Sequence, residues 1–289
     1  MLKRSLMTLK DNPLISILLI AAIVLSAASS MLLLKDTNRM MEISKEMTAI
    51  PADPDRMNIQ SLTEMLCIML KLVGFSLVTS GLGIVFIAGM GNMLAAAMNG
   101  GKASIKIFFF GIKKFFGKTL LSLLLFLAII FGFSILTSII SIPFTVAGIV
   151  SKTSFDPEMM LGRQRITQIV ISVAMIFLYP LVLLWLPAIF IDRNDGVVAC
   201  FKNGVRAGVK KYRILVAVAA VLMLPTLVFY VVTQDIASIP GSPFGILMYI
   251  YQAIVIPVLL SFLFVLYQEI RTKQGEMDAN NMLKDNNAI

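Results

Sequence analysis

Long apolar runs separated by short polar connectors form the dominant pattern of this chain. A helix needs about 20 apolar residues to cross a hydrocarbon core of roughly 30 Å. Six runs reach that length, and only the second contains a charged residue, Lys71. The pattern predicts an all-α fold, a polytopic transmembrane helical bundle of six spans, as a single integral membrane domain over residues 1–289. The predicted spans are 13–34, 65–89, 119–142, 166–191, 214–232 and 244–267.

The first run also resembles a cleavable secretory signal. Lys3, Arg4 and Lys10 precede it, and a patch of small residues lies at 27–30. However, the apolar run continues to Leu34, past the candidate cleavage point, and it is longer than a usual signal core. We therefore expect an uncleaved first span.

The composition indicates that the chain faces mainly lipid. Of its 289 residues 58% are hydrophobic and 14% are charged, with a mean hydropathy of +0.90, whereas soluble domains carry about 25% charged residues. Histidine is absent, which excludes Ser-His and Cys-His catalysis and the HExxH metal site. Cys67 and Cys200 form no CxxC pair. We predict no catalytic residues, no cofactor and no metal site, and we do not expect an enzyme.

The distribution of Lys and Arg predicts the orientation of the spans. The amino terminus, the second and fourth connectors and the carboxyl-terminal tail carry 3, 5, 6 and 3 basic residues, 17 together, against 7 in the other connectors. Basic connectors stay on the cytoplasmic side, so both termini, including the polar tail 268–289, are predicted to be cytoplasmic. The net charge of +9 is spread between apolar runs. This favours the lipid bilayer and its anionic head groups as partners and argues against nucleic acid.

Two of the basic connectors show helical amphipathicity. At about 100° per residue, the Lys residues of 105–118 share one side and Ile and Phe residues share the other. The segment 201–213 repeats this arrangement, with basic residues four positions apart. We predict two cytoplasmic interfacial amphipathic helices that bind anionic lipid. The alternative is that their basic residues only determine the orientation of the neighbouring spans. The candidate lipid- and interface-binding residues are Lys106, Lys113, Lys114, Lys118, Lys202, Arg206, Lys210, Lys211 and Arg213.

The two connectors also match in sequence. Residues Gly208 to Tyr212 read Gly-Val-Lys-Lys-Tyr, and residues Gly111 to Phe115 read Gly-Ile-Lys-Lys-Phe, at a constant offset of 97. Each of these segments directly precedes a predicted span. The match predicts a parallel duplication in which the second and third spans correspond to the fourth and fifth.

Three polar residues in or beside the spans are candidate intramembrane functional residues: Lys71, Asn92 and Gln252. Lys71 lies two turns from Glu64, so a snorkelling side chain or a local pair competes with a functional cation. The glycines of the second span favour close packing of another helix. A bend or a solute path near Asn92 is the alternative.

Prolines predict kinks in the later spans. Pro180 and Pro187 lie in the fourth span, and each frees a backbone carbonyl from the helical ladder. The kinks predict a vestibule lined by Tyr179, Trp185 and Gln252. Tyr and Trp also serve as anchors at the membrane interface, which is the competing interpretation.

One segment carries a family resemblance, from Phe190 to Arg213, which reads FIDRNDGVVACFKNGVRAGVKKYR. It resembles a broad group of prokaryotic six-span membrane proteins in which a span is followed by an acidic-Gly turn, a basic helix and the next span. The group includes the membrane domain of glycerophosphodiester phosphodiesterases. The likeness covers mainly 90–120 and 187–215, and Asn203-Gly204 replaces the more usual Arg-Ser pair. The resemblance implies a compact helical bundle in a prokaryotic plasma (cell) membrane and transfers no catalytic residues.

These features predict a non-catalytic plasma-membrane component. We expect an accessory or structural protein that engages anionic lipid, or the helices of a partner membrane protein, through its basic connectors. The alternative is a permease or export component with a cavity between the two repeats. Substrate-dependent flux in proteoliposomes distinguishes the two.

Overall fold

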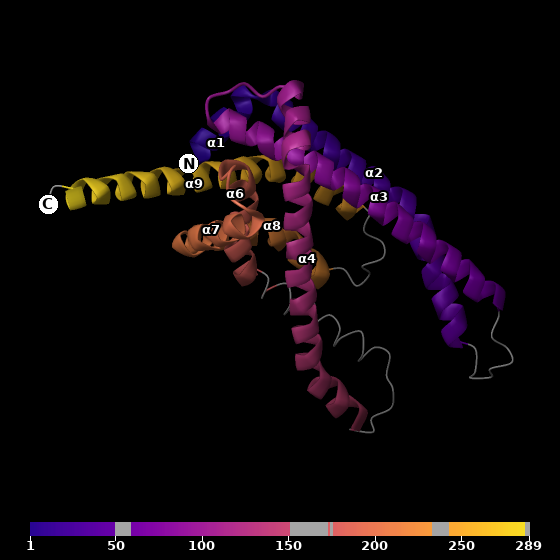
Figure 1. Ribbon diagram of the computed structural model, residues 1–289. Coiled ribbons are helices and arrows are strands. Elements are labelled where there is room, and N and C mark those ends of the chain that lie inside the picture. The colour runs from indigo at the N-terminus through magenta and orange to yellow at the C-terminus, as the bar shows by residue number, and fades with distance from the viewer. Residues whose placement is uncertain (50–58, 151–172, 174–175, 233–242, 287–289) are drawn as a thin grey trace.

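The computed structural model describes residues 1–49, 59–150, 173, 176–232 and 243–286. Every secondary-structure element in these ranges is a helix, which confirms the predicted all-α fold class. Figure 1 shows the N- and C-terminal ends on the same side of the molecule. The helices are α1 (Leu2–Asp11), α2 (Pro13–Ala49), α3 (Ile59–Met98), α4 (Ile105–Val150), α6 (Trp185–Ile191), α7 (Val197–Lys210), α8 (Tyr212–Val232) and α9 (Pro243–Asn286).

Three helices in the described ranges are long and apolar enough to cross a membrane: Pro13–Met40, Leu62–Met98 and Gly245–Gly275. They contain the first and second predicted spans and all but the first residue of the sixth. Two further apolar segments, Ile176–Ile191 and Tyr212–Met223, are shorter than a bilayer requires. The third predicted span lies within α4, and the first part of the fourth, 166–172, lies outside the described residues.

Helices α2 and α3 form an antiparallel hairpin. At 1.5 Å per residue, their 37 and 40 residues extend about 55–60 Å, and Figure 1 shows them side by side. Two ion pairs join them: Arg39 Nε lies 2.8 Å from Glu64 Oε1, and Lys71 Nζ lies 2.6 Å from Asp36 Oδ2. The expected local pair of Lys71 with Glu64 is therefore wrong, because Glu64 is bound to Arg39 and Lys71 reaches across to the other helix.

Helix α3 ends in a glycine turn that contacts the start of the chain. The N–H of Gly101 bonds to the Ala96 carbonyl at 3.0 Å, and Gly100 has a φ of 78°, a conformation that suits glycine at a helix carboxyl terminus. The next residue but one, Ala103, donates its N–H to Asn12 Oδ1 at 2.7 Å. The junction between α1 and α2 and the turn before α4 are thereby held together.

The core lies where α3, α4, α6 and α9 meet. The rings of Phe115, Phe190 and Phe264, one from each of the last three helices, pack at centroid distances of 5.2 Å and 6.2 Å. Gly91 of α3 makes room for this stack, because a Cβ there would overlap the Phe190 ring. The predicted close packing at glycines of the second span is confirmed at this end. At Gly74, Gly81 and Gly83, in contrast, an added Cβ would meet no atom within 4 Å, so no close packing is seen there.

The first basic connector does not form a separate interfacial helix. Residues 105–118 are the first turns of α4, which continues without a break to Val150. The prediction of an independent helix there is wrong. No proline or turn signal separates 105–118 from the apolar residues that follow, so the backbone hydrogen bonds continue through both segments.

The second basic connector forms a separate helix, as predicted. It is α7, which begins after Gly196 and ends at Lys210, with one residue between it and the start of α8 at Tyr212. Its buried side consists of small residues, and Gly204 and Gly208 lie one turn apart on it. A Cβ at Gly204 would lie 2.6 Å from Trp185 Cα, and one at Gly208 would lie 2.7 Å from the Pro180 carbonyl. This spacing of small residues lets two helix backbones approach closely.

The fourth predicted span is interrupted, as its two prolines predict. Residues 176–182 are helical, Leu183 and Leu184 form a turn, and α6 begins at Trp185. Pro187 has no N–H to donate to the Leu183 carbonyl, so the helical ladder opens at that point. In contrast, α8 and α9 continue through Pro225 and Pro257.

Two close helix contacts have the same spacing along the chain. Gly111 of α4 packs on Asn92 of α3, and Gly204 of α7 packs on Trp185 of α6. In both pairs 19 residues separate the partners, and the two contacts are 93 residues apart, whereas the sequence match has an offset of 97.

Candidate functional site

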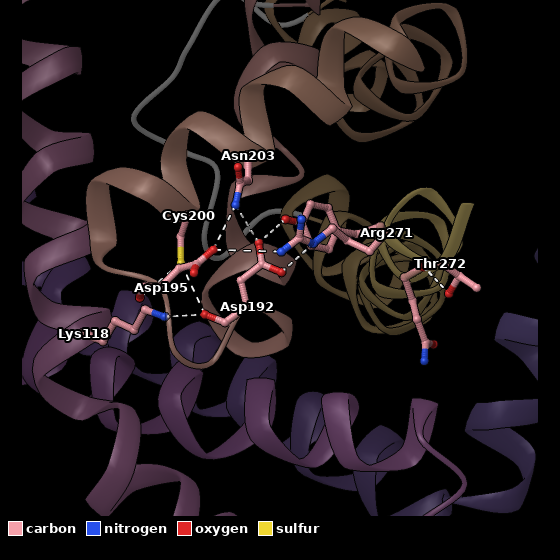
Figure 2. Close-up of polar contacts among 9 residues, drawn as sticks. Lys118, Asp192, Asp195, Cys200, Asn203, Arg271 and Thr272 are labelled. Atoms are coloured by element: carbon pink, nitrogen blue, oxygen red, sulfur yellow. Dashed lines mark hydrogen bonds and ion pairs between the residues drawn. The ribbon is translucent and has the colours of Figure 1, made fainter. Parts of the chain in front are cut away.

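The carboxylate of Asp192, where α6 ends, is a buried charged group that accepts hydrogen bonds from three side chains. Its side chain is only 2% exposed. Figure 2 shows the residues that surround it, which come from four parts of the fold: the start of α4, the turn after α6, helix α7 and helix α9. We call this set the Asp192 cluster. It consists of Lys118, Asp192, Asp195, Cys200, Asn203, Tyr267 and Arg271.

Three side chains donate hydrogen bonds to the Asp192 carboxylate. The Tyr267 hydroxyl donates to Oδ2 at 2.6 Å, Asn203 Nδ2 donates to the same oxygen at 3.0 Å, and Arg271 Nε donates to Oδ1 at 2.8 Å. Arg271 neutralises the buried charge, and the amide and hydroxyl satisfy the remaining acceptor positions. These three donors compensate for the burial of the carboxylate, which suits a structural role.

Asp195 is the more peripheral acid of the cluster. Its side chain is 40% exposed, its Oδ2 accepts from Asn203 Nδ2 at 3.1 Å, and it lies 3.9 Å from an Arg271 nitrogen. Asn203 thereby joins both acids of the turn to α7. This residue and Gly204 are the two positions at which the chain departs from the Arg-Ser pair of the group that it resembles, and the structure gives both a packing role.

Lys118 and Cys200 lie on the other side of the same turn. Lys118 Nζ donates to the Asp192 backbone carbonyl at 3.0 Å, so this lysine is bound within the protein. The Cys200 thiol is buried and lies 3.7 Å from the Asp192 and Asp195 carbonyl oxygens. Burial raises the pKa of the Cys200 thiol above its ordinary range, and the charges of Asp192 and Asp195 act in the same direction, against the influence of Lys118. The thiol is therefore protonated and a weak nucleophile at neutral pH.

The other predicted lipid-binding residues are basic and mostly exposed, and they lie in the first turns of α4, on α7 and at the start of α8; we call these eight residues the basic surface. Seven of the eight are exposed and Lys211 is half-buried. None of the eight forms an ion pair with an acid of the described ranges, and Lys114 Nζ lies 5.9 Å from the centre of the Phe110 ring. The basic surface consists of Lys106, Lys113, Lys114, Lys202, Arg206, Lys210, Lys211 and Arg213.

The three candidate intramembrane residues lie apart from one another. Lys71 is on the α2–α3 hairpin, paired with Asp36. Asn92 is buried at the crossing of α3 and α4, where its Nδ2 donates to the Ile107 carbonyl at 2.9 Å. This bond holds two helices together, which is a packing role. Gln252 is half-buried on α9 and belongs neither to the Asp192 cluster nor to the cavity described next.

An apolar cavity of about 310 Å³ lies between α4, α6, α8 and α9. Tyr179 and Trp185 line it, as the sequence predicts for a vestibule, whereas Gln252 does not. Leu, Ile, Val and Phe side chains form most of its wall. Three of the lining residues each have a buried polar atom without a hydrogen-bond partner in the described part of the chain: Thr119 Oγ1, Ser122 Oγ and Trp185 Nε1.

Sequence reasoning missed the Asp192 cluster and the unpartnered hydroxyls of Thr119 and Ser122. Asp192 lies in the acidic-Gly turn of the segment that carries the family resemblance, and this turn was the signal that could have indicated a functional or structural role for Asp192. Its partners Tyr267 and Arg271 follow 75 and 79 residues later. Arg271 falls in the segment that was expected to be a polar tail, whereas α9 continues through it to Asn286.

Comparison with known proteins adds no relative. No family model, no curated protein and no solved structure matches this chain. The fold itself defines the class: an all-helical membrane protein with three helices, among those described, that are able to cross a bilayer.

Proposed function

We propose that this protein is a non-catalytic component of a plasma membrane whose basic surface binds anionic lipid head groups. In this proposal the chain crosses the membrane six times, with both termini and the basic surface on the cytoplasmic side. The resemblance to the prokaryotic six-span group and the excess of Lys and Arg in alternate connectors support this orientation.

The observation that carries the proposal is the unpaired state of the basic surface. Arg39 and Lys71 of the α2–α3 hairpin and Arg271 and Lys273 of α9 have carboxylate partners, whereas Lys35 of the hairpin has none in the described ranges. The eight residues of the basic surface have none in the described ranges, and seven are exposed. A row of solvated cations beside apolar helices is attracted to anionic head groups.

The test measures stabilisation of the full-length protein in detergent by added lipid. A ligand that binds only the folded state raises the unfolding temperature, and the rise increases with the affinity and concentration of the ligand. We expect a larger rise with phosphatidylglycerol than with phosphatidylcholine. A fivefold Gln variant of the basic surface should lose this difference. The substituted residues are Lys106, Lys113, Lys114, Arg206 and Lys210.

The matched control removes five charges from the connectors predicted to face the opposite side: Lys35, Arg56, Lys152, Arg163 and Arg165. This control should keep the preference for phosphatidylglycerol. If both variants lose the preference equally, the effect reflects net charge alone and the proposal fails. Equal stabilisation of the unaltered protein by the two lipids leads to the same conclusion.

The cavity favours a second candidate function, a permease or export component. It lies between helices of both proposed repeats, α4 from the first and α6 and α8 from the second. Such a protein would move a solute through this space by a relative motion of the repeats. Flux in proteoliposomes that contain this protein alone would favour the permease over the lipid-binding component.

A further inference from the structure

Helix α1 is fixed along one side to α9, and Figure 1 shows the two helices next to each other. Two hydrogen bonds join them: the Ser5 hydroxyl donates to the Val258 carbonyl at 3.2 Å, and the Ser261 hydroxyl donates to the Ser5 carbonyl at 3.3 Å. Leu9 lies one turn after Ser5, on the same side of α1, and is buried as well. This side of α1 therefore belongs to the protein core.

The adjacent side of α1 exposes two leucines and two lysines. Leu2 and Leu6 are four positions apart and share one side of the helix, and they are 54% and 48% exposed. At about 100° per residue, they lie between the buried Leu9 on one flank and Lys3 and Lys10 on the other. Both lysines are exposed, and neither forms an ion pair with an acid of the described ranges.

The end of α1 fixes its distance from the membrane. Asn12 ends the helix, with its Nδ2 donating to the Thr8 carbonyl at 3.1 Å and its Oδ1 accepting from the Ala103 N–H at 2.7 Å. The next residue begins Pro13–Met40, the first helix that is long and apolar enough to cross a membrane. Since α1 has 10 residues, about 15 Å of helix, all of it lies within that distance of the start of this helix.

We propose that α1 is an interfacial anchor, in which Leu2 and Leu6 insert among the acyl chains at the edge of the bilayer and Lys3 and Lys10 lie at phospholipid phosphates. Lipid is the partner that fits both features, because acyl chains remove the leucines from water and phosphates neutralise the unpaired lysines. Phosphate is common to zwitterionic and anionic phospholipids. The inference therefore does not require the preference for anionic lipid that is proposed for the basic surface, and it depends only on Pro13–Met40 crossing the membrane.

Spin labels along α1 test this placement in the full-length protein. In a Cys67→Ser background, single cysteines carry a nitroxide in phosphatidylcholine vesicles, and the background alone measures any labelling of the buried Cys200. Oxygen concentrates in the hydrocarbon and a nickel chelate stays in water, so the ratio of their collision rates with the label reports its depth. The labelled variants are Leu2→Cys, Leu6→Cys, Lys10→Cys and Asp11→Cys.

We expect the labels at Leu2 and Leu6 to collide mainly with oxygen and the label at Asp11 mainly with nickel. Asp11 lies opposite Leu2 on the helix, so their labels should differ in depth by about 10 Å, one helix diameter. The label at Lys10 should lie between these depths, near the phosphates. The matched control is Ile17→Cys, an apolar position that is 60% exposed on α2 and should collide mainly with oxygen.

Mainly nickel collisions at both leucines would overturn the inference, because α1 would then project into water. Labels at both leucines that neither reagent reaches would overturn it too, because protein would then cover this side of α1. A water-accessible label at Ile17 would contradict the spanning role of α2 and with it the placement of α1. Failure of the proposed function is a separate result: equal stabilisation by phosphatidylglycerol and phosphatidylcholine leaves the order of depths in phosphatidylcholine vesicles unchanged.

Discussion

Asp192→Asn is the substitution that tests the Asp192 cluster most sharply, because it keeps the shape of the side chain and removes its charge. The carboxylate accepts from Arg271 on one oxygen and from Tyr267 and Asn203 on the other. An asparagine has one carbonyl oxygen and one NH₂ group. Whichever way it points, its NH₂ faces a donor, either the guanidinium of Arg271 or the amide of Asn203.

The size of the effect follows from these contacts. A hydrogen bond to a charged group contributes about 1.5–3 kcal/mol, and losing its partner leaves a buried donor unsatisfied. The Arg271 side chain is 41% exposed, so water replaces part of what the guanidinium loses. We expect Asp192→Asn to lower the local opening free energy by about 2 kcal/mol, a factor of roughly 30 in the opening equilibrium.

Cys200 provides the assay. Its thiol lies against the Asp192 and Asp195 carbonyls and its residue is fully buried, so an alkylating reagent reaches it only when the turn opens. In a Cys67→Ser background Cys200 is the only thiol of the chain. Asp192→Asn should then speed alkylation of Cys200 by roughly 30-fold at neutral pH.

A change of charge alone also accelerates this reaction, and the control accounts for it. The charges of Asp192 and Asp195 both raise the pKa of the Cys200 thiol, so removing either one increases the thiolate fraction. Asp195→Asn removes the same charge from a more exposed position and should accelerate alkylation by less than about threefold. A rate–pH profile separates the effects, since a pKa change moves the midpoint and easier opening raises the plateau.

Equal acceleration in the Asp192→Asn and Asp195→Asn variants would refute the structural role of the Asp192 carboxylate. An unchanged rate in Asp192→Asn would do so as well, because it would mean that the three donors do not hold the turn closed. We therefore predict a large increase in the rate of Cys200 alkylation for Asp192→Asn and a small increase for Asp195→Asn.

Two further substitutions test packing and charge elsewhere. Gly204→Ala places a Cβ 2.6 Å from Trp185 Cα. Because a backbone atom cannot move aside as a flexible side chain does, we expect the free energy of unfolding to fall by about 1–3 kcal/mol, despite the better helix propensity of Ala. Thermal unfolding in detergent measures it, and Gly117→Ala, with no atom within 4 Å of the added Cβ, should be neutral or stabilising. For Lys71, a double-mutant cycle with Lys71→Gln and Asp36→Asn should give a coupling below about 1 kcal/mol if the side chain snorkels to the membrane–water interface, where water screens the pair. A much larger coupling would contradict this surface-pair interpretation.

The sequence predicts the local features of this fold well because each depends on nearby residues. Apolar runs specify the helices, and the prolines at 180 and 187 predict the interruption before Trp185. The prediction of a separate interfacial helix at 105–118 was wrong because it relied on charge pattern and not on a signal that ends a helix. Charge pattern indicates where lipid head groups lie but does not end a helix. Helix α4 continues past Lys118 because no proline there interrupts its backbone hydrogen bonds.

The Asp192 cluster could not be predicted in the same way. Its bonds connect the turn after α6 with residues 75 and 79 positions later on α9. No periodicity links such distant segments. A single aspartate in a polar connector looks like a solvated charge, and only the packing of α6 and α7 against α9 shows that it is buried and needs three donors.

Under the proposed duplication, the spacing of 93 residues between the two helix contacts gives this cluster a counterpart in the first half of the chain. An offset of 93 places Asn99, in the turn after α3, opposite Asp192, in the turn after α6. Adjacent residues of α9 bind both: Gln268 Nε2 donates to Asn99 Oδ1 at 3.0 Å, and the Tyr267 hydroxyl donates to Asp192. The first bond is an exposed contact between neutral amides, whereas the second belongs to a buried, charged cluster. A hydrogen bond to a buried charge contributes more than an exposed neutral one. Under the proposed duplication, α9 therefore holds two equivalent turns with unequal strength, and the turn after α6 is the firmer of the two attachments.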